Sequence, residues 1–236
     1  MGTSETTQAV TLRVGGFTPL STLDYPGELA TVVFCQGCPW RCRYCHNGDL
    51  LPARGAREIP WSEVRMFLEH RRGLLDAVVF SGGEPTLQGA LGAALEQVRA
   101  LGYRIGLHTA GIYPDRLARV LPQVDWVGLD IKAPATDYAA ITGIPGSGEA
   151  AWESARCLIA SGVEYEIRVT LHPALLDPAA LEGVLIDLER LGARQILLQP
   201  CRTHTILDPT LPGPSEVDMG PYRALLSAHP TVAVRL

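Results

Sequence analysis

The sequence predicts an α/β fold in which parallel strands alternate with helices. Six or seven strand-like segments alternate with helix-like segments along the 236 residues, and such alternation is typical of a parallel sheet covered by helices. The total falls just short of the eight units of a closed barrel. Polar and glycine-rich residues follow one strand after another, as expected when a site forms at the carboxyl ends of parallel strands.

The expected strands are short apolar runs. Residues 29–34 (LATVVF) form a continuous apolar run of strand length, which predicts a strand buried on both faces. An earlier strand is expected at residues 11–17, followed by an ordered loop or a short hairpin. Further strands are expected at residues 77–80, 103–108, 124–131, 165–171, 195–199 and 231–236.

The expected helices lie between these runs. Residues 61–72 carry Val64, Phe67 and Leu68 on one face and end before Gly73. An aspartate N-cap followed by a proline begins a helix that extends from residue 178 to about residue 191. Other helices are expected at residues 87–101, 115–121, 150–160 and 216–228. Residues 1–10 are expected to be disordered, and residues 11–236 to form a single domain.

The bulk composition excludes several classes of function. A net charge of −5 argues against general nucleic-acid binding, which usually needs a basic face. No apolar run approaches the length of a membrane span, and the N-terminal residues lack the pattern of a secretory signal. We therefore expect a cytoplasmic protein without a nucleic-acid or membrane partner.

Four of the six cysteines fall within eleven positions, at residues 35–45. Among them, Cys38, Cys42 and Cys45 have the spacing C-x3-C-x2-C. Three thiolates can hold three irons of a cubane cluster and leave the fourth iron without a protein ligand. A metal site needs such an open position to bind and change a substrate. In a reducing compartment the cluster of cysteines indicates metal binding rather than disulfides.

A zinc site is the alternative interpretation. Cys35 completes the pattern C-x2-C-x3-C-x2-C, and four clustered cysteines can form a closed zinc site that stabilises a binding module. The gap of three residues between the two pairs makes that geometry cramped. Cys35 can equally be a small residue at the end of a strand.

Polar residues of several types follow the other expected strands. After the second core strand comes a glycine-rich GGEP segment, and later strands end in charged, hydroxyl or imidazole side chains. These residues are Ser81, Gly82, Gly83, Glu84, Pro85, His108, Thr109, Asp130, Lys132, Arg168, His172 and Gln199.

The cysteine spacing, the aromatic Tyr44 before the last cysteine, and the GGEP segment together resemble the signature of the radical S-adenosylmethionine (SAM) enzymes. The resemblance implies a partial (β/α)6-type TIM-like barrel with the site at the carboxyl ends of the strands. It implies a [4Fe–4S] cluster on Cys38, Cys42 and Cys45, with SAM chelating the open iron. Gly82, Gly83, Glu84 and Pro85 would meet the SAM amino group, and Tyr44 would lie at the same cofactor site.

Residues 15–47 resemble the opening of the anaerobic ribonucleoside-triphosphate reductase activating proteins, and LHTAG, VGLDIKAP and RVTLHPALL extend this resemblance over most of the chain. Similarity to the related pyruvate formate-lyase activases implies that Asp130, Lys132 and Arg168 face SAM. Those activases hold a monovalent cation with an Asp-Thr pair. Here His108 replaces the aspartate, while Thr109 matches. His172 is expected at the cofactor site, and His46 and Asn47 are further candidates for its lining.

The resemblance implies an activase. A flavodoxin or ferredoxin would reduce the cluster, SAM would be cleaved to methionine and a 5′-deoxyadenosyl radical, and that radical would abstract hydrogen from a glycine of a partner enzyme. The expected partner is the large subunit of an anaerobic ribonucleotide reductase. The alternatives are an activase of the pyruvate formate-lyase type, a small-molecule enzyme such as a deazaguanine synthase, and the zinc-stabilised binding module.

Overall fold

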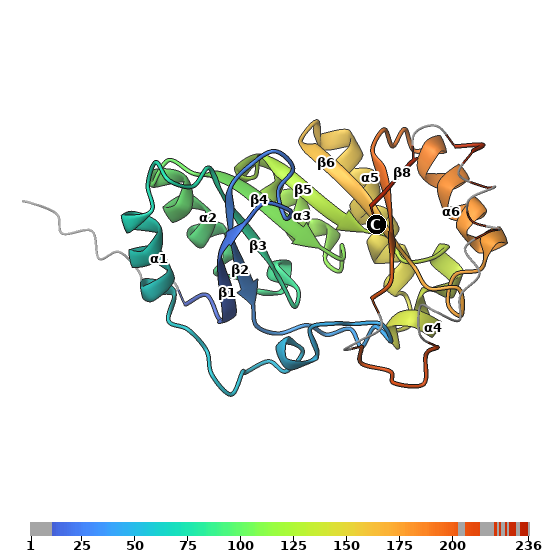
Figure 1. Cartoon of the computed structure of the whole chain (residues 1–236), viewed down its shortest axis with the longest axis horizontal. Coiled ribbons are helices and arrows are strands. Elements are labelled where there is room, and N and C mark those ends of the chain that lie inside the picture. The colour runs from blue at the N-terminus through green and yellow to red at the C-terminus, as the bar shows by residue number, and fades with distance from the viewer. Residues whose placement is uncertain are drawn as a thin grey trace, which may run out of the picture.

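The computed structural model of the chain describes residues 11–202, 206–212, 220, 222, 225, 227–229 and 232–235. These residues form one curved sheet whose strands follow one another in sequence order (Figure 1). All neighbouring strands from β2 onward are parallel, and β1 is antiparallel to β2. The strands are β1 (Val14–Ser21), β2 (Ala30–Cys35), β3 (Ala77–Gly82), β4 (Arg104–Thr109), β5 (Trp126–Asp130), β6 (Glu164–Leu171), β7 (Ile196–Pro200) and β8 (Val232–Val234).

This topology confirms the predicted fold class. A sequential order of parallel strands with helices in the connections is the arrangement of a β/α barrel. In the described part of the chain the edge strands β1 and β8 do not pair with each other, so the barrel is partial. The predicted early strand is part of a hairpin that begins slightly later than expected, at Val14.

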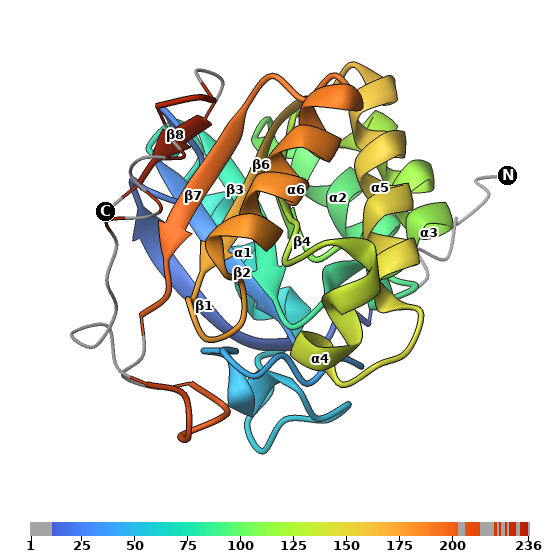
Figure 2. The same ribbon diagram turned by 90° about the vertical axis from the view of Figure 1, so that its right-hand side faces the viewer.

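The helices pack on the outer face of the sheet (Figure 2). Asp177 accepts a hydrogen bond from the backbone N–H of Ala180 at 2.8 Å, which confirms the predicted N-cap. The helices are α1 (Trp61–His70), α2 (Leu91–Ala100), α3 (Pro114–Val120), α4 (Tyr138–Thr142), α5 (Ser147–Ser161) and α6 (Pro178–Arg190).

The helix prediction needs two corrections, and part of it lies outside the described residues. The helix expected at residues 87–101 is divided: Pro85–Leu87 forms a short 3-10 turn, and α2 begins only at Leu91. Gln88, between the two helices, does not continue the helix; its side chain forms hydrogen bonds with the backbone of Arg13 instead. The sequence did not predict α4. The helix expected at residues 216–228 falls mostly outside the described residues, as do residues 1–10.

The alternation of side chains along each strand divides the core into two parts. Val78 and Phe80 of β3 face the helices, whereas Ala77 and Val79 face the inside of the barrel. Trp126 lies with this inner group. Burial of each large apolar side chain contributes about 1.5–3 kcal/mol. Because most of these side chains lie between the sheet and the helices, this layer supplies most of the stability from apolar burial. No helix in the described part of the chain has the length and apolar character needed to cross a membrane.

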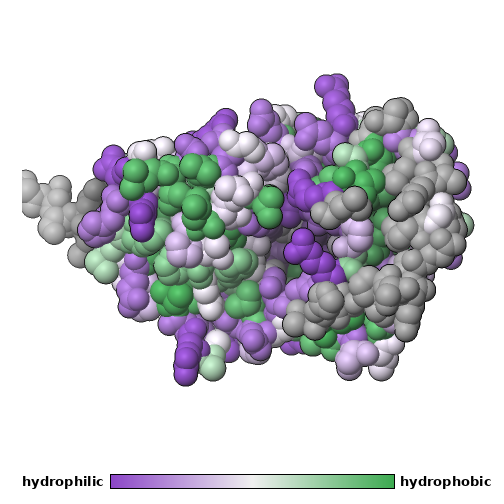
Figure 3. Space-filling view, viewed as in Figure 1, coloured by the Kyte–Doolittle hydropathy of each residue, from purple (hydrophilic) through white to green (hydrophobic). Residues whose placement is uncertain are grey.

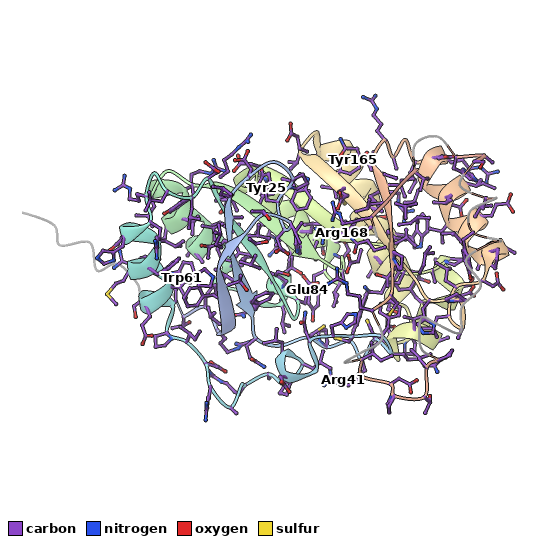
Figure 4. All side chains as sticks on the ribbon, in the orientation of Figure 1. Tyr25, Arg41, Trp61, Glu84, Tyr165 and Arg168 are labelled. Carbon is purple, nitrogen blue, oxygen red and sulfur yellow. The ribbon has the colours of Figure 1, made fainter. Side chains whose placement is uncertain are left out.

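The cysteines lie at the carboxyl edge of the sheet, on the loop that follows β2. This loop runs below the sheet in Figure 1, and Figure 4 places Arg41 of the loop beneath Glu84 and Arg168. In Figure 3 the middle of the face shown is hollowed, and hydrophilic side chains gather around the hollow. The cysteine loop and the GGEP segment therefore meet at the carboxyl edge of the sheet, where Gly83 N–H donates to Cys35 O and Glu84 N–H donates to Gly37 O.

Candidate functional site

The three cysteines of the C-x3-C-x2-C motif lie on the loop that leaves β2. Cys38, Cys42 and Cys45 are each half-buried, and Cys38 is close enough to the other two for their charges to affect it. The backbone N–H of Cys45 donates to Cys42 O at 2.9 Å, which closes a tight turn between the last two thiols. Three thiols grouped on one loop are a donor set that fits an iron–sulfur cluster.

Cys35 does not join this group. It ends β2, is fully buried, and packs into the core that the helices cover. Among the described residues, no three His, Cys, Asp or Glu side chains converge as the ligands of a single metal ion would. The described residues therefore do not converge on a closed zinc site that includes Cys35. The thiolates of a cubane stand farther apart, because each binds a different iron.

Burial keeps the thiols of Cys38 and Cys42 protonated in the protein alone. Burial raises the pKa of Cys38 to about 12. It also raises the pKa of Cys42, although the nearby Lys132 opposes the shift. Because only the thiolate is a metal ligand, iron must displace these protons when it binds.

The start of the cysteine loop is fixed by the following segment of chain. Gly37 N–H donates to Leu50 O at 2.8 Å, and Cys38 N–H donates to Leu51 O at 3.1 Å. The Gln36 amide adds hydrogen bonds to Asp49 O at 3.2 Å and to Pro52 O at 2.7 Å. The first cysteine therefore has a defined position before any ligand binds.

The glycines of the GGEP segment are required by close packing against this loop. A Cβ on Gly82 would lie 2.6 Å from Cys35 N, and a Cβ on Gly83 would lie 2.4 Å from Gly37 O. Gly82 also has a φ of +104°, which disfavours any other residue. The two glycines thus let the end of β3 meet the root of the cysteine loop backbone to backbone.

Glu84 is completely buried, and its carboxylate is engaged within the protein. It accepts from Thr86 N–H at 3.0 Å, Thr86 Oγ1 at 2.6 Å, Thr109 Oγ1 at 2.7 Å and Ala110 N–H at 3.0 Å. Burial nevertheless raises its pKa. A carboxylate has about four acceptor positions. Three of the bonds go to Oε1 and one to Oε2, so a bond to the SAM ammonium would have to use Oε2. The visible role of Glu84 is to join the GGEP segment to β4.

Asp130, Lys132 and Tyr44 form a charged group beside the cysteines. Lys132 Nζ lies 3.3 Å from Asp130 Oδ2 and 5.6 Å from the centre of the Tyr44 ring. The Tyr44 hydroxyl is buried and has no hydrogen-bond partner among the residues that the structure describes. Burial opposes the charge of Lys132, but Tyr44, Asp130 and Cys42 outweigh it and hold the Lys132 pKa well above its ordinary value. An ammonium therefore lies close to one thiol of the motif.

Arg168 points into the barrel from β6. Its Nε lies 3.1 Å from Glu166 Oε1, and its guanidinium covers the Trp126 ring at 5.3 Å from the ring centre. Arg235 Nη2 contacts the other oxygen of Glu166 at 2.9 Å. The backbone of Arg168 is in register with Asp130 on the neighbouring strand. The structure thus brings Asp130, Lys132 and Arg168 to one side of the same opening.

His108 and Thr109 point in different directions. His108 Nε2 donates to Asp24 O at 2.8 Å, and its Nδ1 lies 3.2 Å from Ser81 Oγ, which acts as the donor to a neutral imidazole. Burial, together with the charge of Arg168, holds the His108 pKa well below its ordinary value. Both ring nitrogens are therefore occupied. Thr109 instead faces Glu84.

The remaining candidates lie on the surrounding loops. Asn47 Nδ2 donates to Gly82 O at 3.1 Å and so links the cysteine loop to the GGEP segment. The His46 side chain is exposed, and partial desolvation, together with the charge of Arg202, lowers its pKa. His172 is buried, with Nε2 at 3.2 Å from Pro212 O, and its Nδ1 has no partner in the described part of the chain.

The structure also reveals neighbours of these residues that the sequence alone did not indicate. Trp126, Glu166 and Gly128 hold Arg168, yet none follows the end of a strand, where polar residues were sought. The one usable signal was the glycine inside the otherwise bulky strand WVGLD, because glycine in a strand often marks a close approach.

Comparison with known proteins identifies the class of protein. The sequence profile of the radical SAM superfamily matches residues 32–180, and the chain belongs to this superfamily. The superfamily uses a [4Fe–4S] cluster and SAM, which the three thiols of the cysteine loop fit by their chemistry. The chain is also 33% identical over 172 residues to a pyruvate formate-lyase-activating enzyme of Clostridium pasteurianum, covering 70% of this chain and 71% of that protein. Within the superfamily it is therefore a glycyl-radical enzyme activating enzyme.

Two other similarities define the range of related proteins. A 7-carboxy-7-deazaguanine synthase of Methanopyrus kandleri is 29% identical over 199 residues, with 75% of each chain covered. The structure of SuiB from Streptococcus suis bound to S-adenosylmethionine superposes with a TM-score of 0.64 and 13% identity, covering 85% of this chain and 48% of that one. At such low identity this superposition supports the fold alone.

Proposed function

We propose that Cys38, Cys42 and Cys45 hold the [4Fe–4S] cluster and that the protein generates a glycyl radical on an enzyme of the pyruvate formate-lyase class. The observation that carries the cluster assignment is the group of three half-buried thiols on one loop, beside Lys132 and the GGEP segment. The choice of partner is supported by the similarity to the Clostridium pasteurianum activase.

A [4Fe–4S] cluster held by Cys38, Cys42 and Cys45 would, with SAM, supply the chemistry: one-electron reductive cleavage of SAM and abstraction of a hydrogen atom from the glycine. The electron comes from outside the chain, from a flavodoxin or ferredoxin. The protein itself binds and orients the cofactors and shields them from water and oxygen. In this proposal Lys132 and Arg168 supply positive charge toward the SAM carboxylate, and Asp130 holds the lysine in place.

The other assigned residues shape the cavity. Gly82, Gly83 and Pro85 present backbone at close range to the SAM amino group. In this proposal Tyr44, Thr109 and His172 form its walls, and the buried Tyr44 hydroxyl and His172 Nδ1, which have no partner among the described residues, are polar atoms that a ligand can satisfy. Glu84 keeps the segment in place. These roles can be tested one residue at a time by the affinity of each variant for SAM.

An anaerobic ribonucleotide reductase is the second candidate partner. Residues 15–47 resemble the opening of its activating proteins, and His108 stands where pyruvate formate-lyase activases have an aspartate of the cation site. In this structure both nitrogens of His108 have protein partners, Asp24 and Ser81.

The test is to mix the reconstituted, reduced protein and SAM with each candidate partner under anaerobic conditions. We expect the electron paramagnetic resonance (EPR) doublet of a glycyl radical with a pyruvate formate-lyase, and none with a partner whose target glycine is replaced by alanine. A doublet only with the reductase would select the second candidate. Formation of a deazaguanine product, with no doublet from either partner, would contradict both.

A further inference from the structure

The cysteine loop is tied on one side to the end of α4. Arg41 N–H donates to Thr142 O at 2.9 Å, and Arg43 N–H donates to Ile141 O at 3.0 Å. The Arg41 guanidinium also caps carbonyls inside the loop. This half of the loop is therefore held by a segment that lies within the matched radical SAM region.

The other side of the loop pairs with a segment close to the C-terminus. Leu207 N–H donates to Cys45 O at 3.0 Å, and Asp208 N–H donates to Arg43 O at 2.8 Å. Both the N–H and the carbonyl of Arg43 are thus bound to segments that are distant in sequence. Residues 206–212 lie outside the region that the superfamily profile matches.

The side chain of Asp208 strengthens this pairing. Its Oδ2 lies 2.7 Å from Arg43 Nε. Its Oδ1 accepts from Thr210 N–H at 2.9 Å and from Thr210 Oγ1 at 2.6 Å. Hydrogen bonds from Thr210, followed by that from Arg43, lower the Asp208 pKa to about 2. The carboxylate is thus charged at every working pH, and a short turn fixes its orientation.

We propose that Asp208 is a positioning residue of the cluster site, which acts through Arg43 to fix the spacing of Cys42 and Cys45. Arg43 lies between these two cysteines, so a shift of its backbone moves both thiols. Two backbone hydrogen bonds and one charge-assisted hydrogen bond converge on this short stretch. The inference rests on the proposed assignment of the cysteines as cluster ligands.

The first test uses the protein without iron and so does not depend on activity. Alkylation of individual cysteines is followed by mass spectrometry in the wild type and in Asp208→Asn, which keeps the size of the side chain but removes its charge. We expect about fivefold faster alkylation of Cys42 and Cys45, the effect of losing a partly exposed ion pair. The half-exposed Cys157 on α5 is an internal reference and should react at an unchanged rate.

The second test uses the iron-loaded protein. Release of iron to a chelator should accelerate about fivefold in Asp208→Asn, and the EPR spectrum of the reduced cluster should broaden as the ligand geometry becomes less uniform. Arg43→Gln should behave in the same way. The double variant should be no worse than either single variant, because the two side chains act as one pair.

A matched control is Asp125→Asn at the opposite end of the sheet. Asp125 also pairs with an arginine, Arg99 at 3.1 Å, and also accepts from a backbone N–H, that of Ile105 at 2.7 Å. The Asp125→Asn substitution should lower the stability of the protein without changing the rate of cysteine alkylation or of iron release. The inference is overturned if Asp208→Asn matches the wild type in both assays, or if Asp125→Asn gives the same changes. A wild type that assembles no cluster would contradict the proposed function instead, and the alkylation result would still stand.

Discussion

The guanidinium of Arg168 occupies the space that a side chain on Gly128 would need. A Cβ at position 128 would lie 1.7 Å from Arg168 Nη2. Gly128 lies on β5, next to the strand that carries Arg168, and the missing side chain leaves room for the guanidinium over the Trp126 ring. The position of the arginine is therefore set by the absence of a side chain on its neighbour.

Gly128→Ala should displace Arg168 and weaken SAM binding about tenfold or more, while overpacking costs about 1–3 kcal/mol of stability. The measurements are the KM for SAM in the cleavage assay and the unfolding midpoint in urea. Gly183→Ala is the matched control, because its Cβ meets no atom within 4 Å, and it should be neutral or stabilising. An unchanged KM in Gly128→Ala would argue against a role for Arg168 in binding SAM.

Much of the fold could be predicted because the strands are uniform apolar runs, such as LATVVF before Cys35. The alternation along a strand indicates which side chains share a face, but not how a long side chain turns on that face. The direction of Arg168 depends on Gly128 and Glu166, which the pattern does not connect to it. The short helix α4, with five residues, gave too little periodicity to be recognised.

The candidate site was predictable where it is local in sequence and unpredictable where it is not. The cysteine and GGEP motifs lie on single loops, and their spacing is visible in the chain. Asp208 meets Arg43 across a separation of 165 residues, and nothing near either residue indicates the contact. Glu84 was recognised by its motif, but its four internal hydrogen bonds depend on the packing of β3 against β4.

Glu84→Ala should strongly destabilise the protein. Its removal leaves donors of Thr86, Thr109 and Ala110 buried without an acceptor, and each unsatisfied group costs about 1–3 kcal/mol. Urea unfolding of the iron-free protein measures this effect, and Glu84→Gln should lose less because it keeps one acceptor oxygen. Equal stability of Glu84→Ala and the wild type would contradict the described hydrogen bonding.

Lys132→Met and Asp130→Asn should change the reduction potential of the cluster in opposite directions. Loss of the ammonium near Cys42 disfavours the added electron, so the potential should fall; loss of the carboxylate that neutralises Lys132 should raise it. An EPR-monitored redox titration without SAM measures both variants. Shifts of the same sign would indicate a general disturbance of the loop instead of a charge effect.

His108 should make stability depend on pH below about 6.5. Its pKa is held well below the ordinary value in the folded protein, so on acidification the unfolded chain binds a proton that the folded chain does not. Stability should therefore fall as pH drops below about 6.5, by up to about 1.4 kcal/mol per pH unit. Urea unfolding at several pH values should give a shallower slope for His108→Asn. An identical slope would assign the dependence to other groups.

The most direct test of the central claim is reductive cleavage of SAM by the protein reconstituted with iron and sulfide under anaerobic conditions. With dithionite and SAM, we predict that 5′-deoxyadenosine forms in the wild type and in Cys35→Ala, and that formation is lost in Cys38→Ala, Cys42→Ala and Cys45→Ala. The wild type and Cys35→Ala should also retain iron, whereas the other three variants should lose it. A protein that binds zinc through Cys35 and makes no deoxyadenosine, or one that makes it without these three cysteines, would contradict the account.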